Sequence, residues 1–416
     1  MSDASATRPS GRRGSGNRPV SPRTERAIGY RAAIRHPVAA RLLFAQLISE
    51  AGDFIGLAAL VLLSYSSSRS ALGPALVFAS RSLPALAMAG LLGRWLDRPP
   101  RRVALIAAHL GGAVAIGICA LAPNTGTAIL SSALLGATRA AFRSIQAAVI
   151  AESVPADFRL PLFGAAAVIN QVDQAVGILT GAAVTLTIGV RTSLLIDLAS
   201  FLVAAAVLVG VPPAPRIDRP EQPGPLEGVR IVARHPVLRW LSVLVLASTF
   251  SSSLPEALAP AFVDRQWLPA ALAASSAGGA IFTFGIARTS ILRRVVNQVW
   301  VTVLLAVALW LTGIAVLLHA PDWVYVLGNA AVGAGLGWLI GAQATVAALT
   351  RPERMSQVEA TLVAGLITSG GAGVLLLGLL ANAVSPAAAY LAGGVLLTVA
   401  VLVSAPRLGT VEAAGR

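Results

Sequence analysis

Twelve long apolar segments follow one another from residue 37 onward, and they limit the possible folds more than any other feature. They lie near residues 39–64, 71–96, 103–122, 127–151, 162–188, 192–212, 237–262, 268–292, 297–319, 322–349, 357–383 and 386–405. A transmembrane helix needs about 20 mostly apolar residues, and a helix satisfies its own backbone hydrogen bonds inside a bilayer. The sequence therefore predicts an all-α membrane protein with twelve transmembrane helices.

The composition excludes several other classes of protein. Charged residues make up 12% of the 416 residues, about half of the roughly 25% in soluble domains. A water-soluble enzyme, a disordered chain and a coiled coil are thereby excluded. Cys119 is the single cysteine, so neither an intramolecular disulfide nor a cysteine-ligated metal site is expected. Because the sequence contains no metal-ligand cluster, nucleophile motif or phosphate-binding loop, we expect no metal, no cofactor and no enzymatic activity.

The arginines predict the orientation in the membrane. All 32 basic residues are arginine, which is typical of a bacterial genome of high GC content. With the N-terminus inside, 28 arginines lie at inner ends and loops, and only Arg69, Arg191 and Arg265 lie in outer loops. Since inner loops are enriched in basic residues, we expect a multi-pass protein of the bacterial plasma membrane with both termini in the cytoplasm. The net charge of +14 then reflects this topology, and no nucleic-acid partner is expected.

The chain divides into two similar halves. Two motifs recur at equivalent positions: Arg-His-Pro-Val occurs at 35–38 and at 234–237, and a glycine followed by an arginine pair occurs at 93–102 and at 285–294. Parallel six-helix repeats are typical of transporters with a substrate site between the halves. The expected parts are a disordered, Arg-rich cytoplasmic tail (1–36), an N-terminal six-helix bundle (37–212), a cytoplasmic linker (213–236), a C-terminal six-helix bundle (237–405) and a cytoplasmic tail (406–416).

The first of these glycine and arginine motifs resembles a family signature. It contains Gly93, Asp97, Arg98, Arg101 and Arg102. The stretch resembles the sequence G-x-x-x-D-R-x-G-R-R between helices two and three of the major facilitator superfamily, with a proline in place of the second glycine. This resemblance implies the two-bundle fold of that family and transport by alternating access. A carboxylate at an inner helix end can latch the outward-facing state through an arginine or a helix N-terminus. The alternative is an ordinary positively charged loop.

Further motifs resemble the enterobactin-exporter-like and multidrug-efflux branch of the family. They are Gly52-Asp53, Ala58-Ala59-Leu60, Arg81-Ser82-Leu83-Pro84, Val154-Pro155 and Asp197-Leu198-Ala199-Ser200-Phe201. The branch implies a monomer that exports a small hydrophobic or amphipathic compound, such as a drug, siderophore or natural product, with protons as coupling ion. The antiporter signature of helix five departs from the pattern, because no proline lies between Gly177 and Gly181. This departure weakens the case for antiport.

Ionisable residues inside the apolar segments are the candidates for proton coupling. They are Glu50, Asp53, Asp173, Arg81 and Arg139. Because each unpaired ion at bilayer depth costs about 3 kcal/mol, these groups are expected to be paired, neutralised or in contact with water. We expect Glu50 or Asp53 to load a proton that Arg139 helps to release; a static buried ion pair is the alternative. Asp173 carries either a packing or a coupling role, and Arg81 is either a gate residue or a partner of Asp53 or Asp173.

Polar side chains and one aromatic ring are the candidates for the substrate cavity. They are Gln46, Ser248, Ser252, Trp338 and Gln343. A mostly apolar cavity with scattered hydroxyl groups would suit an amphipathic compound, but these residues also serve as ordinary contacts between helices. Glu256 and Glu359 are expected at segment boundaries.

The sequence leaves other functions open. An uncoupled facilitator or a lipid-type transporter is the main alternative to proton-coupled efflux. A membrane sensor or an assembly subunit that uses the Arg-rich tail, and a membrane-embedded enzyme, are less favoured. In each case of transport the partners are a small-molecule substrate and the lipid bilayer.

Overall fold

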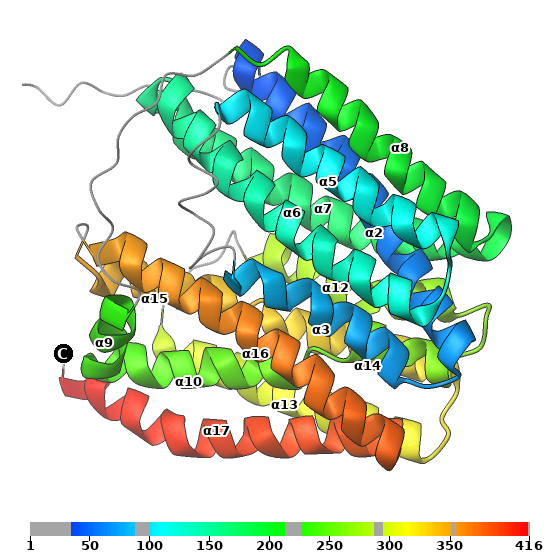
Figure 1. Cartoon of the computed structure of the whole chain (residues 1–416). Helices are drawn as coiled ribbons and strands as arrows, with labels where there is room; N and C mark the ends of the chain where they lie inside the picture. The colour runs from blue at the N-terminus through cyan, green and yellow to red at the C-terminus, as the bar shows by residue number, and fades with distance from the viewer. Residues whose placement is uncertain (1–34, 88–99, 213–225, 287–293, 352–353, 415–416) are drawn as a thin grey trace, which may run out of the picture.

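The computed structural model describes residues 35–87, 100–212, 226–286, 294–351 and 354–414, and within them every regular element is a helix. Six helices come from the first half of the chain. They are α2 (Pro37–Ser68), α3 (Leu72–Ala87), α5 (Arg101–Leu121), α6 (Thr125–Ser153), α7 (Ala156–Ile188) and α8 (Val190–Val209). All of them except α3 form the upper bundle in Figure 1, whereas α3 lies below α6 and beside α16 of the second half.

The second half of the chain forms the lower bundle in Figure 1. Its elements are α9 (Leu226–Arg234), α10 (Pro236–Ser251), α11 (Pro255–Leu258), η2 (Ala259–Ala261), α12 (Leu268–Ile286), α13 (Val295–Leu317), α14 (Asp322–Leu336), α15 (Leu339–Leu349), α16 (Met355–Ala383) and α17 (Pro386–Ala414). Among the described residues, eight helical segments are long and apolar enough to cross a membrane. Within the described residues, each of the twelve predicted apolar segments contains helix, which agrees with the predicted all-α membrane fold.

Two predicted helices are broken in the structure. The segment 237–262 divides after Ser251, and Pro255 begins the short helix α11. Because proline has no backbone N–H, it cannot continue the hydrogen-bond ladder of α10 but is tolerated at a helix start. The segment 322–349 divides at Gly337 and Trp338, between α14 and α15. The first break falls in the polar stretch 248–256, which ends in Pro255 and Glu256, whereas the second falls in a continuous apolar run.

The regions at the two ends of the C-terminal half contain helix. In the expected cytoplasmic tail, α17 continues through Pro406 to Ala414, and Leu408 is buried in the C-terminal core. The expected cytoplasmic linker contains α9, which packs through Gly228 against the start of α16. Residues 1–34, the predicted disordered tail, lie outside the described residues.

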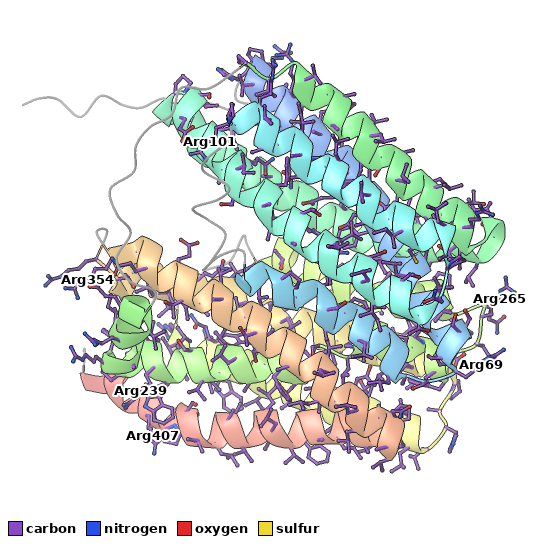
Figure 2. The ribbon with its side chains drawn as sticks, viewed as in Figure 1. Arg69, Arg101, Arg239, Arg265, Arg354 and Arg407 are labelled. Carbon is purple, nitrogen blue, oxygen red and sulfur yellow. The ribbon has the colours of Figure 1, made fainter. Side chains whose placement is uncertain are left out.

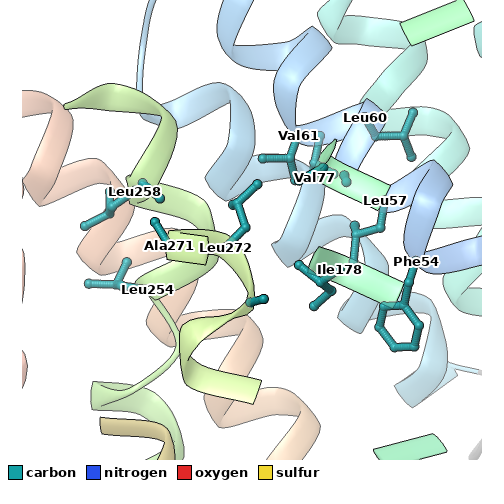
Figure 3. Close-up of a cluster of buried hydrophobic side chains, with 14 of the residues drawn as sticks. Phe54, Leu57, Leu60, Val61, Val77, Ile178, Leu254, Leu258, Ala271 and Leu272 are labelled. Atoms are coloured by element: carbon teal, nitrogen blue, oxygen red, sulfur yellow. The ribbon is translucent and has the colours of Figure 1, made fainter. Parts of the chain in front are cut away.

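The two bundles share apolar and polar contacts. Figure 3 shows buried side chains of both halves in one cluster, with Phe54, Leu57 and Ile178 from the first half and Leu254 and Leu272 from the second. Near the ends of the helices, the Arg265 guanidinium donates to the Leu186 carbonyl at 2.7 Å, and the Tyr65 hydroxyl donates to the Ala261 carbonyl at 3.3 Å. These contacts join the bundles at the end of the molecule that carries Arg265.

The labelled arginines divide between the two ends of the molecule. Figure 2 shows Arg69 and Arg265 at one end and Arg101, Arg239, Arg354 and Arg407 at the other. This division follows the predicted outer and inner groups. Figure 1 shows the bundles in contact at the first end and diverging toward the second.

Two glycines allow α12 and α14 to approach closely. A Cβ atom on Gly278 would overlap the carbonyl of Ala330, and one on Gly333 would overlap the carbonyl of Ser275. Small residues that let helix backbones approach are the usual means of helix packing in membranes. The contact is reciprocal, so each helix presents its glycine to the backbone of the other.

A Gly333→Val substitution is expected to destabilise the protein by at least about 3 kcal/mol, because backbone atoms cannot move aside as a flexible side chain would. Thermal unfolding of the purified chain in detergent measures the effect. Gly285→Val is the matched control, since Gly285 lies in the same helix pair on α12 with nothing within 4 Å of a built Cβ. Equal melting temperatures for the two variants would show that the α12–α14 contact is not close-packed in solution.

Candidate functional site

Two buried acids on α2 and three arginines form a charged network inside the N-terminal bundle. Glu50 and Asp53 are each 4% exposed and lie three residues apart on one helix face. Asp53 is paired with Arg81 of α3, and Arg139 of α6 donates to it at 2.8 Å. Glu50 accepts from Arg143 of α6 at 3.0 Å and lies 3.7 Å from Arg139. Salt bridges thus join α2 to α3 and to α6.

The network has a graded exposure and an imbalance of charge. The side chains of Arg81, Arg139 and Arg143 are 12%, 23% and 44% exposed, so Arg143 is the most solvent-exposed of the three arginines. With both acids ionised, these five residues carry one excess positive charge. Arg139 is shared by Glu50 and Asp53 and also stacks on the ring of Phe54, with the guanidinium carbon 5.2 Å from its centroid. A change in the charge of either acid therefore acts on the other through Arg139.

A small internal cavity adjoins the two acids. Its volume is about 20 Å³, enough for one water molecule, and Ser49, Glu50, Asp53 and His109 are among its lining residues. His109 on α5 is 2% exposed. Its Nδ1 donates to the Leu105 carbonyl at 3.0 Å, because a carbonyl can only accept, and its Nε2 faces the Ser49 hydroxyl at 3.3 Å. The sequence analysis missed His109, whose only signal was a polar residue in an apolar segment.

Two further acids lie outside this network. Asp173 on α7 is buried and forms no ion pair with any described residue. The structure thus places it apart from Arg81, which pairs with Asp53 instead. Asp197 on α8 has no exposed surface, and within the described part of the chain neither of its carboxyl oxygens has a hydrogen-bond partner. It packs against Gly52 and Gly56 of α2, where a larger residue would overlap it.

The predicted latch motif is described only in part. Gly93, Asp97 and Arg98 lie outside the described residues. Arg101 begins α5, and its guanidinium pairs with Glu152 near the end of α6, with Nη2 at 3.1 Å from Oε1 and Nε at 3.3 Å from Oε2. Arg102 donates to the Val209 carbonyl at 3.5 Å. Glu152 is a partner that the sequence analysis did not identify, and the latch itself stays a prediction.

A cavity of about 810 Å³ lies between the two halves. Its lining residues come from both bundles and are Gln46, Arg143, Gln146, Ala166, Gln174, Ser252, Glu256, Ser275, Ser276, Gly279, Thr283, Gly333, Leu336, Gly337, Leu339, Ile340 and Gln343. Arg143 therefore belongs both to the charged network and to the cavity wall. The cavity is within the range of volumes that small-molecule sites occupy, about 300–1,000 Å³.

The cavity corrects part of the sequence interpretation. Gln46, Ser252 and Gln343 line it, but Ser248 and Trp338 do not. Trp338 has no exposed surface and belongs to the C-terminal core. Ser248 is fully buried, and its carbonyl accepts hydrogen bonds from the Ser252 N–H at 3.0 Å and from the Ser252 hydroxyl at 2.6 Å.

The chemistry of the lining agrees with expectation in one respect and differs in another. The surface of the cavity is mostly apolar, with amide and hydroxyl groups interspersed, but no aromatic ring is among its described lining residues. The amide of Gln46 is already used, since it accepts from Gln146 at 2.9 Å and donates to the Ala166 carbonyl at 3.1 Å. Glu256, expected at a segment boundary, lies in the short helix α11 just after the break in α10 and lines the cavity.

Comparisons with known proteins agree with this architecture. Comparison with curated proteins finds no matching relative. Among solved structures, the nucleoside transporter NupG is similar with a TM-score of 0.64 and 13% identity, covering 89% of this chain and 98% of that chain. A bacterial homolog of the human lysosomal transporter Spinster, in an inward-facing and unoccupied conformation, is similar with a TM-score of 0.61 and 16% identity. The comparison covers 90% of this chain and 96% of that chain. A POT family transporter in complex with a thioalcohol-conjugated peptide is similar with a TM-score of 0.65 and 12% identity. The comparison covers 89% of this chain and 96% of that chain.

At these identities the similar structures show the fold alone. The sequence itself matches the profile of the Major Facilitator Superfamily over residues 42–340, which is most of the chain. The match begins within α2 and covers the rest of the N-terminal bundle, with its acid–arginine network, three predicted segments of the C-terminal bundle and part of the fourth. The chain is a multi-pass membrane transport protein, not an enzyme, and it belongs to the Major Facilitator Superfamily.

Proposed function

We propose that this chain exports a small amphipathic organic compound in exchange for protons. The observation that carries the proposal is the contact between the charged network and the cavity: Glu50 and Asp53 are buried in protein, yet Arg143, bound to Glu50, lines the cavity. Buried acids with shared arginines are suited to exchange a proton, because protonation of one acid releases a guanidinium that must find another partner.

A proton on Asp53 would weaken contacts that reach the other bundle. Protonation removes the charge that holds Arg81 of α3 and Arg139 of α6. Arg81 is followed by Ser82, which packs against Gly371 of α16, and Ala75 on the same helix packs against Gly378. Since α3 belongs to the first half and α16 to the second, loss of the Arg81 pair acts directly on the interface that must slide during alternating access.

The arrangement of the bundles supports a state that is open toward the Arg-rich end. The bundles meet at the end that carries Arg69 and Arg265 and diverge toward the end that carries Arg101, Arg239 and Arg354 (Figures 1 and 2). The positive-inside rule assigns the Arg-rich end to the cytoplasm. In that orientation a compound enters the cavity from the cytoplasm, and export follows when the bundles rock.

The lining of the cavity supports an amphipathic rather than a purely hydrophobic compound. Ser252, Ser275, Ser276, Thr283 and Gln343 offer hydroxyl and amide groups. Leu336, Leu339 and Ile340 give the C-terminal wall an apolar strip. A compound without hydrogen-bonding groups would leave these polar groups without partners, which costs binding free energy.

Transport into everted membrane vesicles tests the proposal. With an imposed proton gradient, acid inside, we expect uphill accumulation of amphipathic test compounds that a protonophore abolishes. Vesicles without the protein are the control. Accumulation that only equilibrates, with or without the gradient, would contradict proton coupling and support the alternative of an uncoupled facilitator.

Deletion of residues 1–34 is expected to leave transport intact, whereas a sensor that acts through the tail would lose its function.

A further inference from the structure

Glu256 is a carboxylate on the cavity wall without a protein counter-ion. It lines the 810 Å³ cavity from the C-terminal half. No described residue forms a salt bridge with Glu256; the described pairs join Arg81, Arg139 and Arg143 to acids of α2, and Arg101 to Glu152. Among the lining residues Arg143 is the single cation, and it is held by Glu50 on the opposite half.

The backbone that carries Glu256 is held firmly in place. Pro255 is buried, and its carbonyl accepts a hydrogen bond from the Tyr325 hydroxyl at 3.0 Å. Tyr325 lies 3.0 Å from the hydroxyl of Tyr390, which in turn donates to Asn329 at 2.9 Å. The ring of Phe262 packs edge-on against Tyr325, with centroids 4.7 Å apart. The carboxylate is therefore presented from a rigid support, as a binding group should be.

We infer that Glu256 binds the positively charged group of the transported compound, and that the substrate class is amphipathic organic cations. An ionised group in a partly desolvated cavity is costly without an opposite charge, and the described protein supplies none beside Glu256. The hydroxyl groups of Ser252, Ser275 and Ser276 lie in the same wall and suit polar substituents. Leu336, Leu339 and Ile340 suit the apolar body of such a compound. The inference rests on the proposed transport of a compound held in this cavity.

Binding of two ions that match in shape and differ in charge tests the inference. The probes are tetraphenylphosphonium and tetraphenylborate, titrated into the purified full-length chain in detergent at constant pH. We expect wild type to prefer the cation. Glu256→Gln is expected to bind the cation about tenfold to a hundredfold more weakly, the usual loss for a charge-assisted contact, without weakening the anion. Equal cation affinity in both proteins, or equal weakening of both ions, would overturn the inference.

Three controls keep the result specific. Glu256→Asp retains the charge and is expected to retain the preference for the cation. Glu359→Gln removes an exposed acid outside the cavity lining and is expected to bind both ions as wild type does. In wild type, tetraphenylphosphonium is expected to slow the labelling of Glu256 by dicyclohexylcarbodiimide, followed by peptide mass spectrometry, and tetraphenylborate is not. This measurement needs no variant; labelling that the cation leaves unchanged would equally overturn the inference.

The binding measurement also separates this inference from the proton-coupled mechanism. Titration in detergent involves no proton gradient, so it reports on the cation site alone. An Asp53→Asn variant is expected to bind tetraphenylphosphonium and yet fail in gradient-driven transport. If proton coupling is absent, the vesicles show no gradient-driven accumulation of substrate, but the purified chain still prefers the cation. If the cation site is absent, the preference is missing while gradient-driven transport of other compounds persists. Should Glu256→Gln abolish gradient-driven transport of neutral compounds as well, Glu256 would be a proton carrier and the inference would be wrong.

Discussion

An Asp53→Asn variant is expected to lose all proton-driven accumulation of substrate while it still exchanges substrate between the two sides of the membrane. The amide oxygen of asparagine can accept a hydrogen bond from Arg139, as Asp53 does at 2.8 Å, so the geometry of the network is largely retained. An amide does not take up a proton in the physiological range, so the step that releases Arg81 and Arg139 can no longer follow the proton gradient.

Asp53 is the stronger candidate of the two acids because of its partners. Asp53 holds Arg81 on α3, the helix that packs against α16 of the other half. Glu50 holds Arg143, which is 44% exposed and lies at the cavity wall, and shares Arg139. A proton on Asp53 therefore acts on the contact between the bundles, whereas a proton on Glu50 acts first on the cavity.

Two assays in vesicles measure the effect of Asp53→Asn. Uphill accumulation under an imposed proton gradient is expected to fall to the level of vesicles without the protein, and counterflow of labelled against unlabelled substrate is expected to persist. Asp53→Glu keeps the carboxyl group and is expected to keep part of the accumulation. Asp264→Asn removes an exposed acid outside the network and is the matched control. Normal, protonophore-sensitive accumulation by Asp53→Asn would leave Asp53 with the static structural role.

The features that the sequence predicted depend on local patterns. Long apolar segments predict helices wherever they occur, and the arginine distribution predicts which ends lie together. The spacing of Gln46, Glu50 and Asp53 places them on one face of a helix, whatever the helix packs against. The presence of Arg139 in another segment suggested a partner because an unpaired ion in a membrane is costly.

The features that it did not predict depend on how the helices are rotated and broken. Trp338 is buried in the core and Glu256 lines the cavity, and each lies at a helix break that the sequence analysis did not predict. His109 and Asp197 are isolated polar residues in apolar segments, and nothing in their own segments shows what lies against them. Their surroundings come from α2, which is distant in the sequence. The rule that an ionisable residue within a membrane segment needs an explanation would have drawn attention to Asp197.

An Arg139→Ala variant is expected to lower the free energy of unfolding by about 1.5–3 kcal/mol, because Asp53 and Glu50 each lose a charged contact while they keep Arg81 and Arg143. Arg139 is the one arginine within this network that contacts both Glu50 and Asp53, and it also loses its contact with Phe54. Unfolding in mixed detergent micelles measures the change. Arg191→Ala removes an exposed arginine and is the matched control, with an expected effect within about 0.5 kcal/mol.

The double variant Asp53→Asn with Arg139→Ala shows whether the loss arises from the charge left behind. If the penalty of Arg139→Ala comes from an ionised Asp53 with too little compensation, neutralising Asp53 recovers part of it, by about 0.5–3 kcal/mol. Glu50→Gln combined with Arg139→Ala is expected to recover less of the lost stability, because Glu50 lies 3.7 Å from Arg139 and keeps Arg143 at 3.0 Å. Strictly additive effects would mean that Arg139 stabilises the bundle through its packing on Phe54 and not through the acids. The network could then not transmit the charge of Asp53, and the proton-coupled mechanism would lose its physical basis.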